Sequence, residues 1–166
     1  MQRLACKLLA NICDSNCAMA RKLVSSVNLI DRFKSRISNP HTGWRERHEY
    51  IRVLCSPAYS IPPEELLKYC SESNVFSLML EYVLNNASST KDYATTPEEH
   101  ALNSLILVVN KLSERYPISK QVVQYFEQLD LLLYMISTCF GNHKKLINHL
   151  AEGLLKKVRT YALNNR

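Results

Sequence analysis

The sequence predicts an all-α fold, and three observations lead to this prediction. The chain has 166 residues, 46% of them hydrophobic, with only three glycines and six prolines, which are few for the many turns of a β-sandwich or barrel. One segment with the features of a helix boundary occurs three times. Between its copies lie helices with apolar residues on more than one side. We therefore expect residues 1–166 to form a single helical domain with a continuous core.

The repeated segment predicts three equivalent helix starts. In each copy one helix ends, a few polar residues follow, and an Asn or Asp stands just before a new apolar-periodic run. These residues are Asn28, Asn74 and Asp130, separated by 46 and 56 residues. The side-chain oxygen of Asn or Asp can accept a hydrogen bond from an unpaired backbone N–H in a first helical turn. We interpret the three residues as N-caps.

A second kind of helix is predicted between these caps, with large apolar residues three, four and seven positions apart. Such helices are typical of the inner layer of a stack, and we expect a chain of about eight to ten helices in all. The residues that define the four copies are Leu4, Leu8, Leu9 and Ile12; Tyr50, Ile51, Val53 and Leu54; Leu102, Leu105, Ile106, Val109 and Leu112; and Ile147, Leu150, Leu154, Leu155 and Val158.

Prolines and polar residues mark the expected helix boundaries. Pro63 and Pro97 each begin a helix with acidic residues in its first turn, and Thr96 with Glu99 has the spacing of a capping box. Residues 85–96 have no apolar period, so we predict a mobile loop there. The remaining expected markers are breaks at Pro40, Pro57 and Pro117 and a cap at Asn142.

Composition and charge exclude several classes of protein. No apolar run approaches the roughly 18 to 20 residues that cross a bilayer, and Arg3 and Lys7 lie inside the first apolar stretch, unlike the charges of a signal peptide. The six cysteines are spread through apolar helices, which predicts reduced thiols in a cytoplasmic or nuclear protein. Of the net charge of +6, residues 1–52 carry +6, residues 53–142 carry −5 and residues 143–166 carry +5. This distribution predicts at most two basic patches.

Residues 4–30 resemble the armadillo family. An Ala-rich apolar helix closes on Asn11-Ile-Cys, and a polar link, a short helix and an Asn-led second helix follow. The resemblance implies a right-handed armadillo-like α-solenoid of about three to four repeats, with a HEAT-like or irregular helical array as the alternative. The pattern starts and ends on a third helix of a repeat. We therefore expect a fragment of a longer array, or a short protein that pairs end to end.

The resemblance also implies a binding groove. In peptide-binding members of the family, third-helix asparagines hold the backbone of an extended ligand, and Asn11 and Asn110 match these asparagines by position. Ser56 and Lys157 occupy the other two places. The single Trp44 lies outside the position used by nuclear-import adaptors, so we do not expect a receptor for nuclear-localisation signals.

The sequence contains no pattern typical of an enzyme. Cys13 and Cys17 straddle an expected helix break, and no cysteine or histidine spacing completes a four-ligand metal set. A nucleophile motif and a Gly-rich phosphate loop are also absent. The paired acids, Glu64 with Glu65 and Glu98 with Glu99, fall in first helical turns, where the helix dipole accounts for them. We expect no catalysis, no metal and no cofactor.

Three functions remain as expectations. The first is a protein-interaction module that binds a partner segment in a groove formed by Lys7, Asn11, Arg47, Asn103 and Asn110. The second is nucleic-acid binding, RNA included, through basic residues, which solvated helix faces would equally explain. These residues are Arg32, Lys34, Arg36, Arg45, Arg47, Arg52, Lys144, Lys145, Lys156 and Lys157. The third is an architectural role through self-association.

Overall fold

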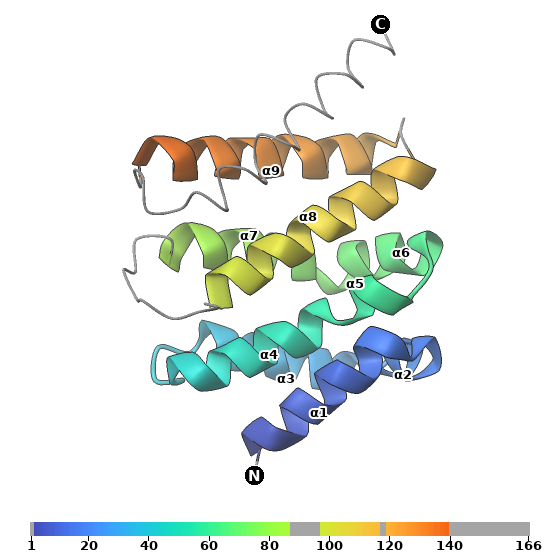
Figure 1. Ribbon diagram of the computed structural model, residues 1–166, viewed down its shortest axis with the longest axis vertical. Helices are drawn as coiled ribbons and strands as arrows, with labels where there is room; N and C mark the ends of the chain where they lie inside the picture. Colours follow the sequence, from blue (N-terminus) through green and yellow to red (C-terminus); the bar gives the residue numbers. More distant parts are fainter. Residues whose placement is uncertain (1, 87–96, 117–118, 140–166) are drawn as a thin grey trace, which may run out of the picture.

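The computed structural model describes residues 2–86, 97–116 and 119–139, and the regular elements within them are helices (Figure 1). This confirms the all-α prediction for the described part of the chain. Asn142, Thr96, Pro117, the helix expected around Ile147–Val158 and most of the expected loop at 85–96 lie outside it. The helices are α1 Gln2–Ser15, α2 Cys17–Val24, α3 Val27–Ser38, α4 Trp44–Cys55, α5 Pro57–Ser60, α6 Pro63–Ser73, α7 Val75–Asn86, α8 Pro97–Arg115 and α9 Lys120–Cys139.

Two layers of helices are visible in Figure 1. Helices α1, α4 and α8 lie side by side and run in the same direction, with α4 in contact with α1 on one side and α8 on the other. Helices α3 and α7 run back behind them, with α3 packed on α4 and α7 packed on α8. Helix α9 contacts α7 and α8 at the opposite end of the stack from α1.

Local sequence signals fix several helix boundaries as expected. Pro63 and Pro97 are the first residues of α6 and α8, and Glu64 and Glu65 occupy the first turn of α6. Proline suits this position because its missing N–H would have no partner in a first turn. Asn16 caps α2 by accepting a hydrogen bond from the backbone N–H of Met19 at 3.1 Å.

Of the three predicted N-caps, one stands directly before a helix, and the structure shows that residue as the C-cap of the preceding helix. Asn74 stands between α6 and α7, where it adopts a left-handed backbone conformation with φ of 55°, which asparagine tolerates better than most residues. Ser26, not Asn28, precedes α3, and Asp130 lies inside the unbroken α9. Helix α9 continues past Asp130 because its buried residues keep one helical period on both sides of it, namely Val122, Tyr125, Leu129 and Leu132.

The core is continuous and centres on α4 and α8. Tyr50 and Leu54 of α4 are fully enclosed, and the Tyr50 ring stacks on Phe33 of α3 with 5.5 Å between centroids. Phe76 of α7 stacks on Tyr125 of α9 in the same way at 4.2 Å. The buried hydroxyl of Tyr69 donates to the backbone oxygen of Leu54 at 2.9 Å, which satisfies a carbonyl in the last turn of α4.

The inner-layer prediction is wrong for the outer side of α1. Leu4, Leu8 and Ile12 were expected to pack inside, but they are 62%, 53% and 43% exposed. The buried residues of α1 are the small Cys6, Ala10 and Cys13. Helix α1 lies at the end of the stack, so among the described residues α4 covers one of its sides and no helix covers the opposite one (Figure 1).

Five cysteines are seen as free thiols, and four of them are enclosed. Cys6, Cys13, Cys55 and Cys70 are buried, whereas Cys17 is half-buried. Burial raises the pKa of both Cys55 and Cys70 to about 12, so these two thiols are protonated near neutral pH. Within the described ranges, no helix has the length and apolarity that a membrane span requires.

Candidate interaction surface on α1, α4 and α8

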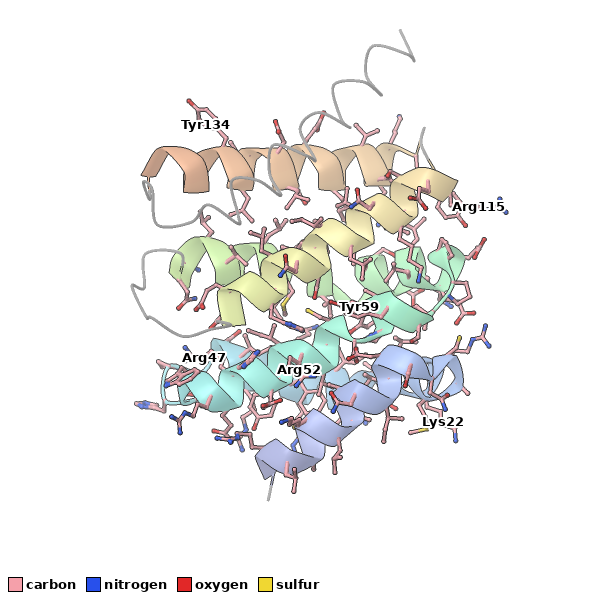
Figure 2. The ribbon with its side chains drawn as sticks, in the orientation of Figure 1. Lys22, Arg47, Arg52, Tyr59, Arg115 and Tyr134 are labelled. Carbon is pink, nitrogen blue, oxygen red and sulfur yellow. The ribbon has the colours of Figure 1, made fainter. Side chains whose placement is uncertain are left out.

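Arg52 links α1 to α4. These two helices and α8 form the front layer, and Arg52 lies on the side of this layer that faces solvent. Its Nη2 donates to Oδ1 of Asn11 on α1 at 2.7 Å, and its Nη1 lies 3.7 Å from Oε2 of Glu49 one turn earlier on α4. The side chain of Arg52 is 20% exposed. The guanidinium is therefore held in a fixed orientation at the α1–α4 contact while part of it remains open to solvent (Figure 2).

Acidic groups surround this guanidinium. Burial raises the pKa of the Asp14 carboxyl on α1, and the nearby Arg52 cation opposes that shift. Oε2 of Glu49 is buried without a hydrogen-bond donor among the described residues. Arg52 therefore balances the charge of groups that solvent reaches poorly, and the site is an ion cluster rather than an isolated cation.

Two histidines fill the seam between α4 and α8 beside this cluster. The rings of His48 and His100 meet edge to face with 5.8 Å between their centroids. Burial lowers the pKa of both imidazoles, to about 4 for His100, and the Arg52 cation acts in the same direction. Glu49 and Glu98 oppose the shift at His48. Both rings are therefore neutral at neutral pH.

The short helix α5 extends the surface toward the C-terminal ends of α1 and α8. Tyr59 is 46% exposed there, and Figure 2 shows it beyond the C-terminal end of α4. Nζ of Lys111 on α8 donates to the backbone oxygens of Ala58 at 3.1 Å and Ile61 at 2.6 Å. Oγ of Ser60 donates to the backbone oxygen of Cys13 on α1 at 2.6 Å. These bonds hold α5 between its two neighbours.

All five predicted groove residues lie on α1, α4 or α8, the helices of the front layer. Lys7 and Asn11 are exposed on α1, and Asn103 and Asn110 are exposed and half-buried on α8. Asn103 and Asn110 lie seven residues apart, which places them on one side of that helix.

Arg47 lies apart from the other four. It donates to the backbone oxygen of Asn39 at 2.8 Å and lines a surface hollow of about 280 Å³ together with Leu78 and Tyr82 of α7. Five residues along a helix separate Arg47 from Arg52 by about 140°, so Arg47 lies on another side of α4 than the residue that bonds Asn11. Ser56 is also unsuited to line a surface, since it is buried and donates to the backbone oxygen of Val53.

The predicted basic patch is divided among different neighbours. Lys34 donates to the backbone oxygen of Ser73 at 2.8 Å and pairs with Asp31 at 2.9 Å, and Arg47 and Arg52 are hydrogen-bonded as described. The guanidinium of Arg45 lies over the Trp44 ring, 5.2 Å from its centroid. The other two described members of the predicted patch, Arg32 and Arg36 on α3, are exposed. Lys144, Lys145, Lys156 and Lys157 lie outside the described residues.

Sequence reasoning missed the pairing of His48 with His100 and the place of Arg52 at the centre of the surface. The two histidines are 52 positions apart, and no local pattern joins them. The two asparagines of α8 could be found, because their spacing alone places them on one side. Within the described residues, no group of three or more His, Cys, Asp or Glu side chains is arranged to hold a metal ion.

Comparison with known proteins adds no relative. No protein-family model, no curated protein and no solved structure matches the chain. The functional argument therefore depends on the placement of the chain's own residues.

Proposed function

We propose that this chain is an armadillo-like helical-repeat module that binds a segment of another protein on the surface of α1, α4 and α8. The observation that carries the proposal is the alignment of these three helices side by side in one direction, with α3 and α7 running back behind them (Figure 1). Such a layer provides a long surface made of equivalent helix sides, on which repeat proteins bind their partners.

The side chains on this layer suit an extended peptide. Asn11, Asn103 and Asn110 carry both a hydrogen-bond donor and an acceptor, so each can pair with the backbone of a bound strand. Arg52 adds donors whose direction the bond to Asn11 already fixes. A fixed donor loses little conformational entropy when a ligand binds.

Site-specific photo-crosslinking tests the proposal. A benzophenone amino acid at the exposed Asn103 is expected to crosslink a discrete partner in cell extract, and the same label at the exposed Lys68 of α6 serves as the control. The variant Asn11→Ala with Asn110→Ala, which removes side-chain amides without touching the core, should then weaken the crosslink and lower the affinity for the identified partner about tenfold. Equal crosslinking from both label positions, or unchanged affinity of the double variant, would remove the proposal.

A further inference from the structure

An apolar stripe runs along the outer side of α1, at the end of the stack. Leu4, Leu8 and Ile12 are spaced four residues apart, so their side chains follow one another along one side of the helix. All three belong to the most exposed large hydrophobic side chains of the described residues. Scattered exposed apolar residues are ordinary on protein surfaces, but a contiguous row of three on one helix is typical of an interaction site.

A hollow adjoins this stripe between α1 and α3. It has a volume of about 350 Å³ and is lined by Ala5, Cys6, Leu9, Leu29, Arg32 and Phe33. Its walls are therefore mainly apolar, with one guanidinium at the α3 side. A side chain the size of leucine or phenylalanine fits a hollow of this volume. The stripe and the hollow together therefore form an apolar surface with a depression that can accept one side chain.

Cations border this surface on both sides. Arg3 and Lys7 are exposed one position before Leu4 and Leu8, which places them in a parallel row about 100° around the helix. On the α3 side, Arg32 lines the hollow and Arg36 follows one turn later, also exposed.

Few acids on α1 and α3 balance these cations, while on α4 Glu46 and Glu49 lie close enough to act on the Cys6 thiol of the hollow. Helix α1 contains a single acid, the half-buried Asp14 beside Arg52, and helix α3 contains a single acid, Asp31, which pairs with Lys34. The apolar stripe thus lies between two rows of positive charge.

We propose that this end surface, formed by the stripe and the hollow, binds an amphipathic helix with acidic residues on both flanks of its apolar side. Apolar side chains of the partner pack on Leu4, Leu8 and Ile12 and enter the hollow. Its acidic flanks meet Arg3 and Lys7 on one side and Arg32 and Arg36 on the other. Helices bind grooves in this manner through apolar residues at helical spacing, and flanking charges fix the orientation. The proposal stands independently of the groove on α1, α4 and α8.

Charge and area favour this occupant over a second copy of the chain. Two copies joined through this surface would place each row of cations against another, which is unfavourable. Three half-exposed side chains also provide far less area than the roughly 1,600 Å² buried in a stable interface. An anionic membrane would satisfy the charges, but a bilayer surface does not fill a hollow between two helices as a protruding side chain does.

Fluorescence anisotropy with a designed probe tests the proposal. The probe is a labelled amphipathic peptide of about 18 residues, with leucines at helical spacing and glutamates on both flanks, and the matched peptide carries lysines in place of the glutamates. We expect the acidic peptide to bind the 166-residue chain at least about tenfold more tightly than the basic one, with an affinity that falls as salt rises.

Surface variants assign the binding to these residues. Leu8→Ser is expected to weaken binding of the acidic peptide about five- to tenfold. Arg32→Glu combined with Arg36→Glu should weaken the acidic peptide and strengthen the basic one. Val27→Ser, at an exposed apolar position of α3 outside the stripe, should change neither. The altered side chains are exposed, so circular dichroism should show folded protein in each case.

Four outcomes would overturn the proposal. The first is equal binding of the two peptides or absence of binding, and the second is an affinity that Leu8→Ser leaves unchanged. Sedimentation velocity that shows Leu8→Ser converting a dimer to a monomer would identify a second copy as the occupant. Sedimentation with anionic phospholipid vesicles that Leu8→Ser abolishes and the acidic peptide does not compete would identify a membrane surface.

Discussion

Helices α1 and α4 begin from similar sequence patterns and reach different environments. Both carry apolar residues on more than one side, and both belong to the same layer of parallel helices. Helix α4 lies between α1 and α8, and its Ile51 and Leu54 are fully buried. Helix α1 lies at the end, where its small residues pack and Leu4 and Leu8 are exposed. The position of a helix in the stack, rather than its apolar content, determines which of its sides contributes to stability.

The largest expected effect on stability is the difference between truncating a leucine of α4 and truncating a leucine of α1. Leu54→Ala should lower the free energy of unfolding by about 3 kcal/mol, because it leaves a cavity in a fully enclosed site. Leu8→Ala should lower it by less than about 0.5 kcal/mol, since the side chain is already half-exposed. Urea unfolding of both variants measures the difference. Similar losses would mean that the outer side of α1 is covered in solution, which would break the comparison.

The free energy of unfolding should depend on pH through His100, which is buried between α4 and α8. The pKa of His100 in the folded chain is about 4, against an ordinary value of 6.5. As pH falls through this interval, the unfolded chain takes up a proton that the folded chain does not. The free energy of unfolding should therefore decrease by about 2 to 3 kcal/mol between pH 6.5 and pH 4.

The variant His100→Gln is the control for this effect. It should flatten that part of the stability–pH curve, measured by urea unfolding at each pH. If the slope stays as steep, His100 is not the group whose titration causes it. The corresponding outer side of α1 has no histidine, so no matching effect is expected from it.

A smaller effect is expected at the end of α4. Tyr69→Phe removes the hydroxyl that donates to the Leu54 carbonyl, and it should lower the free energy of unfolding by about 1 to 2 kcal/mol because the carbonyl remains buried. Tyr59→Phe, at a half-exposed tyrosine of α5 whose hydroxyl interacts with Ser104, is the comparison variant and should cost less, about 0.5 kcal/mol. Thermal unfolding monitored by circular dichroism compares them. Equal losses would contradict the assignment of this hydroxyl to the α4 terminus.

The smallest effect concerns the link between the two helices. Asn11→Ala removes the acceptor of the Arg52 hydrogen bond at an exposed position, so it should lower the free energy of unfolding by only about 0.5 kcal/mol. A double-mutant cycle with Arg52→Ala should give a coupling of about 0.5 to 1 kcal/mol. A coupling near zero would show that this bond does not join α1 to α4 in solution.

The sequence predicted the features that depend on local chemistry. Pro63 and Pro97 mark helix starts because each lacks a backbone N–H that would have no partner in a first turn, and both boundaries were predicted. Asp130 has the side chain of a cap, but α9 continues through it because tertiary burial on both sides outweighs the local preference. A cap is therefore a signal that packing can override.

The arrangement of the candidate surfaces could be predicted only in part. Helical spacing was enough to group Asn103 with Asn110, and it also places Arg47 and Arg52 about 140° apart on α4. The contact of His48 with His100 depends on how α4 and α8 pack, and no sequence spacing encodes it. The exposure of Leu8 could not be predicted, because an apolar period does not state which neighbour covers it.

The buried thiols give the chain a set of internal reporters. A thiol must be both exposed and ionised to react with an alkylating reagent, and Cys55 and Cys70 are neither in the folded chain. Their modification therefore requires a local or global opening of the helices. The rate of modification reports how often such openings occur. Cys6 and Cys13 report the separation of α1 in the same way. Mass spectrometry of a timed alkylation would thus show, without introduced labels, whether the end helix opens before the centre.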